Sequence, residues 1–315
     1  MADPSVDIIT AIRTDKTGGA SPTGCALAQA CKELCDPREY GSCAEVKDAL
    51  YDLLRQAVNA QPTMATIKYV ANEVALVVEG RLSGGTGEDV DAVCSEIREK
   101  CSHLIKRSCE DVARIGMIVA RALPDDGTIV TVSLSRTIIE SLSAARSLGK
   151  QLTLCVLEGR PGGEGVATAH EAIKLGHNVL LAPDAAAYEH VRSARCVLVG
   201  ADAILANGDT INKVGTATVA VCAKTCGAPV WAAAESWKYD ILSRFGTRPD
   251  LARSPDVNPF GVQLSPGISL DTRMFEIVPR DYVDLLVTEM GAGSPDAVAS
   301  WGSTLPVSQF IQSLL

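Results

Sequence analysis

Aromatic side chains are scarce in this sequence. They make up 4% of its 315 residues, and most of the apolar content comes from alanine, valine, leucine and isoleucine. Small and β-branched side chains suit helices that pack closely on a buried parallel sheet. Apolar runs long enough to span a bilayer are also missing, and the first ten residues carry no secretory pattern. We therefore expect a cytoplasmic protein without a membrane partner.

Positive charge is in short supply too. Twenty-nine lysine and arginine residues face 38 aspartate and glutamate residues, which gives a formal net charge of −9, and no stretch is strongly basic. Nucleic-acid binding depends on a surface that neutralises phosphates, so the sequence argues against a direct nucleic-acid partner. A local basic pocket for one small phosphate is still compatible with this balance.

The sequence also lacks cysteine and histidine residues at the spacing of a metal site. The chain has eleven cysteines but no CxxC pair, and its four histidines are not clustered, so we expect no metal site and no cofactor. Cys94, Cys101 and Cys109 recur at about two helical turns, as apolar residues do on one helix face. Free cysteine packs as a small hydrophobe, and reduced thiols fit the cytoplasm. A redox role is the alternative.

The first 120 residues have apolar residues at three- and four-residue intervals, which predicts helices. These helices are expected at 26–34, 43–59, 64–78 and 88–122. The last of them ends at Leu123-Pro-Asp-Asp-Gly127, a typical helix stop. We interpret residues 1–124 as a helical N-terminal domain.

After this stop, short apolar runs alternate with segments of helical length. Strands are expected at 128–132, 152–156, 178–182, 196–199 and 229–233. Helices are expected at 136–149, 164–176, 185–193, 211–227 and 280–290, and from Pro295 onward. The alternation predicts an α/β fold, with residues 125–315 forming a Rossmann-like domain around an open parallel sheet.

Ligands bind such sheets just beyond the carboxyl ends of the strands. Polar residues follow all five predicted strands, and helix N-caps account for some of them. They are Ser133 and Ser135-Arg136, Glu158-Gly-Arg160, Asp184, Gly200-Ala-Asp202, and Glu235-Ser236 with Lys238. Arg160 suits a phosphate because its guanidinium is a planar fork, although a solvated arginine is the alternative.

Polar residues are densest in the stretch from Gly200 to Thr216. Asp209, in an Asn-Gly-Asp turn, is the only acid of that turn and the best candidate for a general acid or base. Lys213 and Thr216, with the first N–H groups of a following helix, could cradle a phosphate. The alternative is a tight turn that only caps the helix. Near the N-terminus, residues 13–20 form another candidate anion loop, but they lack P-loop spacing.

Gly200-Ala-Asp202, Asn207-Gly-Asp209, Asn212-Lys-Val-Gly-Thr216 and Ala234-Glu-Ser-Trp-Lys238 together resemble the family of translation initiation factor 2B alpha, beta and delta subunits. This superfamily also contains ribose-1,5-bisphosphate and methylthioribose-1-phosphate isomerases. The resemblance implies a phosphorylated small molecule as ligand and a homodimer or higher oligomer. The residues that it implies for binding are Arg160, Asn212, Lys213, Gly19, Ala20, Ser135 and Arg136.

The resemblance also implies a catalytic pair in the isomerases, a cysteine after the first strand and an aspartate in the Asn-Gly-Asp turn. Here Asp209 fills the aspartate position, while Ser133 stands where the cysteine is expected. A serine hydroxyl is a much poorer acid than a thiol. An arginine of the N-terminal phosphate loop is also replaced, by Gly18, and the segment ending in Ser135-Arg136 is similar to that of the initiation factors.

We therefore expect an initiation-factor-like subunit that binds a phosphorylated metabolite or nucleotide without standard isomerase activity, with an initiation-factor partner. The alternative is an aldose–ketose isomerase of a sugar 1-phosphate, with Asp209 as acid or base and Ser133 in place of the cysteine. A different reaction that uses Asp209 without a thiol is the third option.

Overall fold

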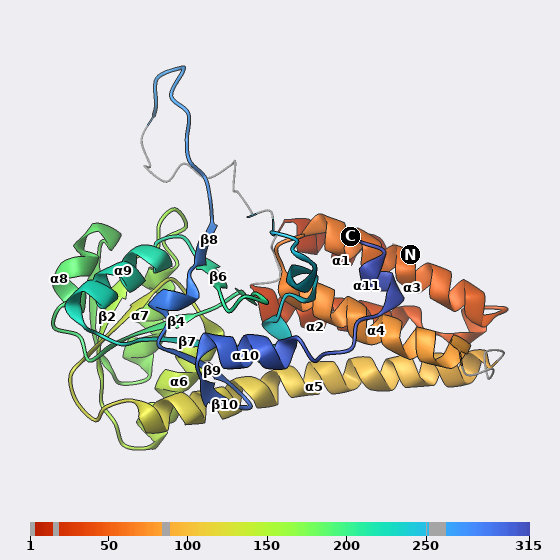
Figure 1. The fold of residues 1–315 in the computed structure, drawn as a ribbon, viewed down its shortest axis with the longest axis horizontal. Helices are drawn as coiled ribbons and strands as arrows, with labels where there is room; N and C mark the ends of the chain where they lie inside the picture. Colours follow the sequence, from red (N-terminus) through yellow and green to blue (C-terminus); the bar gives the residue numbers. More distant parts are fainter. Residues whose placement is uncertain (1–3, 15–18, 84–88, 250, 252–262) are drawn as a thin grey trace. The chain divides into compact units, whose positions relative to one another are not determined.

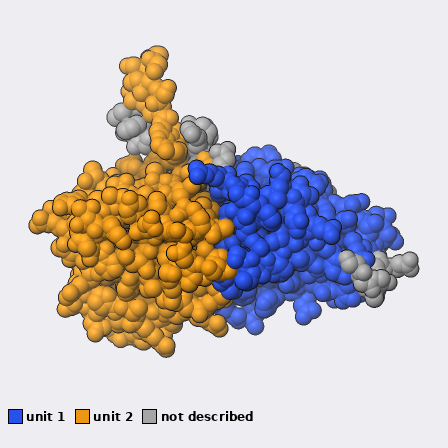
Figure 2. All heavy atoms as spheres, viewed as in Figure 1, with its two compact units in different colours: residues 1–110, 237–250, 301–315 blue, residues 111–236, 251–300 orange. Residues whose placement is uncertain are grey.

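The computed structural model describes residues 4–14, 19–83, 89–249, 251 and 263–315. The chain divides into two compact units, coloured separately in Figure 2. The first comprises residues 1–110, 237–250 and 301–315, and the second comprises residues 111–236 and 251–300. The predicted domain boundary between residues 124 and 125 stays a prediction, because compactness does not test which segments fold independently.

Helices build the first unit (Figure 1). They are α1 (Pro4–Arg13), α2 (Ala20–Leu34), α3 (Cys43–Ala60), α4 (Ala65–Ser83), α11 (Gln309–Gln312), the short helices η1 (Pro37–Glu39) and η4 (Ile241–Phe245), and the first part of α5 (Val90–Ala122). The expected helices of the N-terminal region are thus present, and α2 begins six residues earlier than its apolar pattern predicted. Their apolar faces form one core that includes Leu27, Leu50, Leu54, Ile67 and Ile97.

A capping interaction fixes where helix α3 begins. The Ser42 hydroxyl accepts a hydrogen bond from Glu45 N–H (3.3 Å), and the Glu45 carboxylate accepts one from Gly41 N–H (2.8 Å). Such reciprocal caps satisfy backbone donors that the first helical turn leaves without partners. Cys31, Cys35, Cys94 and Cys101 are all buried in the same core, where they pack as small apolar groups.

A seven-stranded sheet organises the second unit (Figure 1). Its strands are β1 (Thr128–Val132), β2 (Thr153–Leu157), β3 (Asn178–Ala182), β4 (Cys196–Gly200), β7 (Val230–Ala233), β9 (Leu285–Thr288) and β10 (Gly291–Gly293), in the order β10-β9-β7-β4-β1-β2-β3. All neighbouring strands pair in parallel except β9 and β10. The predicted α/β class with a mostly parallel sheet is confirmed.

Helices connect these strands and cover the sheet. They are α6 (Arg136–Ser147), α7 (Gly165–Lys174), α8 (Ala187–Val191), α9 (Thr216–Cys226) and α10 (Pro295–Gly302), with the short helices η2 (Asp184–Ala186) and η5 (Arg280–Tyr282). The short helix η3 (Ser236–Lys238) follows β7, and its last two residues belong to the first unit. Ile115 and Val119 at the end of α5, and Leu123 directly after it, pack into the same core as Ile129 of β1 and Leu142 of α6. Burial on both faces explains why the strands read as continuous apolar runs.

One predicted helix starts too early and another is wrong, for one physical reason. Residues 211–227 were expected as a single helix, but Thr210–Lys213 is strand β6, which pairs with β5 (Ala203–Ile204) and β8 (Phe275–Val278) in a second sheet. Residues 280–290 were also expected to be helical, yet β9 lies there and pairs with β7. In both places pairing with a distant strand overrides a local apolar pattern that fits a helix.

Candidate functional site

The strand order reverses between β1 and β4. The chain passes from β1 outward to β2 and β3, and then returns to place β4 on the other side of β1. In open α/β sheets such a switch point leaves a crevice beyond the carboxyl ends of the two strands. The residues that leave these two strands here are Ser133 to Arg136 after β1, and Ala201 and Asp202 after β4.

Ser133 occupies an unusual backbone conformation at this point. Its φ is +64°, the one positive φ of a non-glycine residue in the described part of the chain. This region costs a residue with a Cβ about 1–3 kcal/mol, and such strain clusters at functional sites. The Thr168 hydroxyl donates to the Ser133 carbonyl (2.7 Å), and the side chain is buried. The surroundings therefore hold Ser133 in place against this cost.

The loop after β2 lies directly against Ser133. A Cβ on Gly159 would come within 3.1 Å of Ser133 Cα, and Gly159 itself has a φ of +74°. The Asp184 carboxylate accepts the N–H groups of Gly159 (2.9 Å) and Arg160 (2.7 Å). Asp184 therefore fixes the shape of this loop, and its oxygens are already engaged.

Ser135 and Asn212 meet beside Gly200. A Cβ at Gly200 would lie 2.6 Å from Ser135 Oγ and 4.0 Å from Asn212 Oδ1, so only glycine allows this approach. The amide of Asn212 donates to Thr216 Oγ1 (3.0 Å), which orients it. Ser135 is the N-cap of α6, and its hydroxyl makes no capping bond to the helix. The exits of β1 and β4 and the end of β6 thus bring three predicted site residues, Ser133, Ser135 and Asn212, to one edge of the unit.

Lys213 ends β6 beside Asn212, and its side chain is only 5% exposed. Its Nζ donates to Glu164 Oε1 at 2.5 Å, with Glu164 at the N-cap of α7. The second carboxylate oxygen, Glu164 Oε2, is buried and has no hydrogen-bond partner among the described residues. Glu164 was not predicted as a site residue, because 49 residues separate it from the lysine that it contacts.

The predicted phosphate cradle at the start of the helix after Lys213 has a different structure. Helix α9 begins at Thr216 behind Gly215, whereas Asp209 directly precedes strand β6 and Thr210 is the first residue of that strand. The Ala217 N–H, in its first turn, donates to the Glu276 carboxylate of β8 (2.8 Å). The Glu276 carboxylate thus binds one of the N–H groups that we expected to bind a phosphate.

Asp209 lies in the tight turn that leads into β6. Its carboxylate accepts the N–H of Arg280 (2.9 Å) and the side-chain amide of Asn207 (2.7 Å). About four residues of extended strand, or roughly 13 Å, separate it from Lys213. The structure thus does not bring Asp209 to the end of β6 where Asn212 and Lys213 lie.

Asp202 is the carboxylate at the switch point itself. It follows β4 by one residue, and its N–H donates to the Ile211 carbonyl (2.7 Å), which places it next to Asn212 on the facing strand. The side chain is partly exposed. Asp202 was among the polar residues expected beyond the carboxyl ends of the strands, but we selected Asp209 as the candidate acid or base instead.

The predicted arginines are both exposed to solvent. Arg160 has a side chain that is 56% exposed and donates to Glu158 Oε2 (3.1 Å). Arg136 is the first residue of α6, where helix N–H groups and a guanidinium can receive an anion together. Arg136 therefore has the better position for a phosphate at the switch point.

Gly19 and Ala20 belong to the first compact unit. They begin α2, with Gly19 at the N-cap, and the Ala20 carbonyl accepts a hydrogen bond from Thr66 Oγ1 (2.6 Å). Gly18, which stands at the position of an expected arginine, lies outside the described residues. Lys238 also belongs to the first unit and is buried.

Two buried carboxylates follow neighbouring strands of the sheet. Glu235 follows β7 and accepts a hydrogen bond from Thr137 Oγ1 (3.3 Å), while Glu289 follows β9 and accepts the N–H of Ser236 (2.9 Å) and its hydroxyl. These three bonds tie strand exits to neighbouring elements. The sequence indicated Glu235 but not Glu289.

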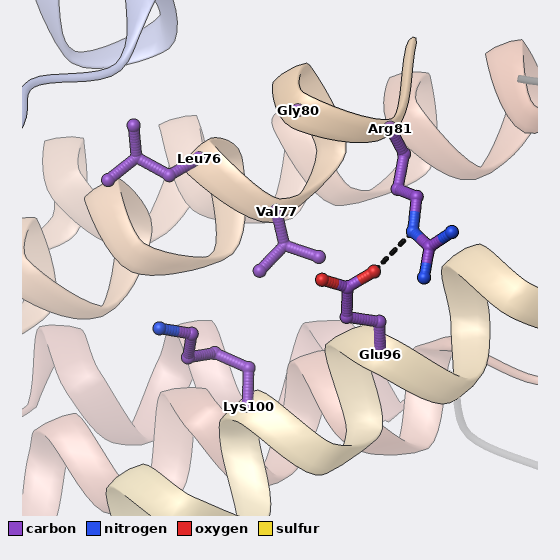
Figure 3. Close-up of a pocket in the computed structure, with 6 residues that line it drawn as sticks. All are labelled: Leu76, Val77, Gly80, Arg81, Glu96 and Lys100. Carbon is purple, nitrogen blue, oxygen red and sulfur yellow. Dashed lines mark hydrogen bonds and ion pairs between the residues drawn. The ribbon is translucent and has the colours of Figure 1, made fainter. Parts of the chain in front are cut away.

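Figure 3 shows an open groove between α4 and α5 in the first unit. It is lined by Leu76, Val77, Gly80, Arg81, Glu96 and Lys100, and its Arg81 and Glu96 form an ion pair. Lys100 pairs with Glu73 (2.9 Å). No group of histidine, cysteine or acidic side chains in the described ranges is arranged to hold a metal ion. Helices with the length and apolar character of a membrane span were likewise not found in those ranges.

Solved structures of similar fold support this architecture. The chain aligns with translation initiation factor eIF-2B of Pyrococcus horikoshii with a TM-score of 0.78, at 22% identity, over 94% of this chain and 99% of that one. It aligns with 5-methylthioribose 1-phosphate isomerase of the same organism with a TM-score of 0.74, at 23% identity, over 96% and 88%. At these identities the likeness concerns the fold.

Six archaeal relatives, 27–29% identical to this chain, carry the name ribose 1,5-bisphosphate isomerase. The one from Methanocaldococcus jannaschii is 28% identical over 285 residues, which cover 90% of this chain and 89% of the relative. These relatives overturn our main expectation of a subunit without isomerase activity. They support the alternative, an isomerase of a sugar 1-phosphate.

The sequence also matches a family as a whole. Residues 16–295 match the Initiation factor 2 subunit family, as the motifs around Asp202, Asn212 and Lys238 indicated. The match spans both compact units. The chain belongs to the Initiation factor 2 subunit family.

Proposed function

We propose that this protein is an aldose–ketose isomerase of a sugar 1-phosphate, with ribose 1,5-bisphosphate as its substrate. One observation carries the proposal: the six relatives of that name include one that aligns over nine-tenths of the chain. The polar switch point, with Ser133, Ser135, Asn212 and Lys213, is a site of suitable character.

The reaction needs proton transfer and no external oxidant, because an aldose 1-phosphate and its ketose 1-phosphate are isomers. The bond between C1 and the ring oxygen breaks, and that oxygen gains a proton. C2 loses its hydrogen and the proton of its hydroxyl group and becomes the carbonyl carbon, while C1 gains a hydrogen and keeps its phosphate. A positioned acid and base accelerate such steps by about 10²–10⁴-fold.

Two carboxylates are candidates for this proton transfer. We propose Asp202 because it follows β4 at the switch point and lies next to Asn212. Asp209 remains the candidate that the sequence pointed to, but its oxygens accept hydrogen bonds from the Asn207 side chain and from the Arg280 N–H. Ser133 would take the place of a second proton-transfer group. Since its hydroxyl is a poor acid, we expect turnover to be slow.

Other groups would bind the substrate. Ser135 and Arg136 at the start of α6 suit a phosphate, because N–H groups and a positive charge converge there. Asn212 and Lys213 would contact the sugar. Arg160, Gly19 and Ala20 remain proposed contacts from the family resemblance.

A homodimer or a larger assembly is part of the proposal. A chain of similar fold comes from a tetrameric eIF2B complex of C. thermophilum. The edge strand β3 of this protein exposes Leu180 and Leu181, which a second subunit could cover. We also propose the cytoplasm as its compartment, since the eleven cysteines are free thiols.

The test is direct. The purified full-length chain is incubated with ribose 1,5-bisphosphate in D₂O, and phosphorus and proton NMR follow product formation and deuterium at C1. Ribulose 1,5-bisphosphate is the expected product. Methylthioribose 1-phosphate serves as the comparison substrate, and faster conversion of it would contradict the proposed substrate. Ser133→Cys is expected to raise turnover, because a thiol is the stronger acid.

A further inference from the structure

The pair formed by Glu164 and Lys213 has an incomplete hydrogen-bond network. Lys213 Nζ donates to Glu164 Oε1 at 2.5 Å, and the lysine side chain is 5% exposed. The glutamate side chain as a whole is 33% exposed. Its other oxygen, Oε2, is buried and receives no hydrogen bond from the described residues. A buried carboxylate oxygen without a donor is unfavourable, and a ligand could supply the donor.

The loop before α7 leaves space for the Glu164 carboxylate, because it has a glycine there. A Cβ at Gly162 would collide with all three atoms of the Glu164 carboxylate group. The same loop reaches back to Ser133 through Gly159, and α7 holds the Ser133 carbonyl through Thr168. The carboxylate therefore stands on the element that also shapes the surroundings of Ser133.

The charges of Lys213 and Glu164 determine which part of a ligand can bind to this pair. The ammonium of Lys213 and the carboxylate of Glu164 cancel, so together they offer no net positive charge to a dianionic phosphate. Oε2 can accept a hydrogen bond, and a sugar hydroxyl can donate one. The chemistry thus favours a sugar hydroxyl over a phosphate at this point.

We infer that Glu164 is a positioning and specificity residue, which holds Lys213 with Oε1 and accepts a hydroxyl of the sugar phosphate with Oε2. This inference rests on the proposed function, which supplies the sugar phosphate. The phosphate then binds elsewhere, and the start of α6 at Ser135 and Arg136 is the place with suitable groups.

Glu164→Gln separates this role from a structural one, because two ligands respond in opposite directions. The variant loses the charged acceptor, so ribose 1,5-bisphosphate is expected to bind about tenfold more weakly. It also frees the positive charge of Lys213, so inorganic phosphate is expected to bind more tightly than it does to the wild type. Glu164→Asp keeps the charge but withdraws it by one methylene, and should weaken sugar-phosphate binding without a gain for phosphate.

Isothermal titration of the full-length chain with each ligand measures both effects. Glu171→Gln is the matched control, since Glu171 lies on the same helix and pairs with Lys174 (2.7 Å) on its exposed surface. The control should bind both ligands as the wild type does. In turnover assays Glu164→Gln should raise KM more than it lowers kcat.

Equal weakening of both ligands in Glu164→Gln, or no change for either, would overturn the inference. The wild type could bind ribose 1,5-bisphosphate without converting it, while Glu164→Gln binds the sugar phosphate more weakly and inorganic phosphate more tightly. That result would contradict the proposed function and support the inference. If the wild type converts the substrate and Glu164→Gln binds both ligands as the wild type does, the proposed function is supported and the inference is overturned. A wild type that does not bind the sugar phosphate would overturn the inference as well.

Discussion

Each compact unit of this protein buries a lysine against a carboxylate, and the two pairs differ in how completely they are satisfied. In the first unit Lys68 Nζ donates to Asp240 Oδ2 at 2.6 Å, with side chains 4% and 1% exposed. The other oxygen, Oδ1, accepts the N–H of Leu242 (3.1 Å). In the second unit Glu164 gives one oxygen to Lys213, and its other oxygen has no donor among the described residues.

This difference separates a structural pair from a candidate ligand-binding pair. Lys68 and Asp240 join α4 to η4, residues 172 positions apart, within the apolar core of the first unit. Such a pair stabilises the fold only while both partners are present. The pair of Glu164 and Lys213 is partly open to solvent and lies beside the switch point. We expect changes there to affect ligand binding more than stability.

The largest effect is expected at the switch point. Asp202→Asn should lower turnover of ribose 1,5-bisphosphate by about 10²–10⁴-fold, because it removes the proposed acid or base. Asp209→Asn should have a smaller effect on turnover, since its carboxylate is engaged with Arg280 and Asn207. NMR assays of both variants test this order. A greater loss in Asp209→Asn would place the proton transfer in the Asn-Gly-Asp turn.

The next largest effect is expected in the first unit. Asp240→Asn should lower the free energy of unfolding by about 3–5 kcal/mol, because Lys68 is then left buried without its partner. Glu164→Gln should lower it by less than Asp240→Asn does, since the Glu164 side chain is 33% exposed and that of Asp240 is 1% exposed. Urea denaturation followed by tryptophan fluorescence compares the two, and Trp237 reports on the first unit. Equal losses would erase the distinction between the pairs.

Packing provides a third comparison, between the helical core and the sheet edge. Leu54 is fully buried, so Leu54→Ala should lower the free energy of unfolding by about 2–5 kcal/mol. Leu181 on β3 is 45% exposed, and Leu181→Ala should cost no more than about 0.5 kcal/mol. Denaturation of dilute protein is the measurement. A large loss in Leu181→Ala would indicate that this edge is covered by another subunit.

The smallest effect is expected at alkaline pH. Burial raises the pKa of the Cys196 thiol from 9.0 to about 12 and that of Cys155 to about 11. The folded protein keeps these protons at a pH where the unfolded chain has lost them. The stabilisation is therefore complete below about pH 9 and is lost as pH rises toward the folded pKa values.

Urea denaturation at several pH values between 8 and 11 measures this slope. Cys196→Ala should make the slope shallower, although it also removes buried volume. Cys109, which is exposed, provides the control through Cys109→Ala, and this variant should leave the slope as it is. An identical slope in Cys196→Ala would contradict the assignment to this thiol.

Much of the fold could be predicted because its signals are local. The strands β1 and β3 have the bounds that the apolar runs predicted, β4 and β7 differ by one residue at one end, and β2 is shifted by one residue. The long helix α5 is also present, two residues shorter at its start than predicted. Buried parallel strands and amphipathic helices both leave periodic patterns. The predicted helix at 280–290 and the first residues of the one at 211–227 are wrong, because pairing with a distant strand decides the structure there.

The site was less predictable for the same reason. The strand-exit rule selected Ser133, Ser135 and Asp202, and the structure places all three at the switch point. It could not show that Asp209 and Lys213 lie at opposite ends of a strand, since a helix was expected there. Nor could it show that Glu164 contacts Lys213, because only the fold brings these side chains together.

Conversion of ribose 1,5-bisphosphate by the wild-type chain tests the central claim most directly. The protein is incubated with the substrate in D₂O, and phosphorus NMR follows the appearance of ribulose 1,5-bisphosphate. Formation of that product, with a large loss in Asp202→Asn, is the result that we predict. Unchanged substrate at high protein concentration, in a preparation whose binding of the sugar phosphate is verified by titration, would contradict the assignment as an isomerase.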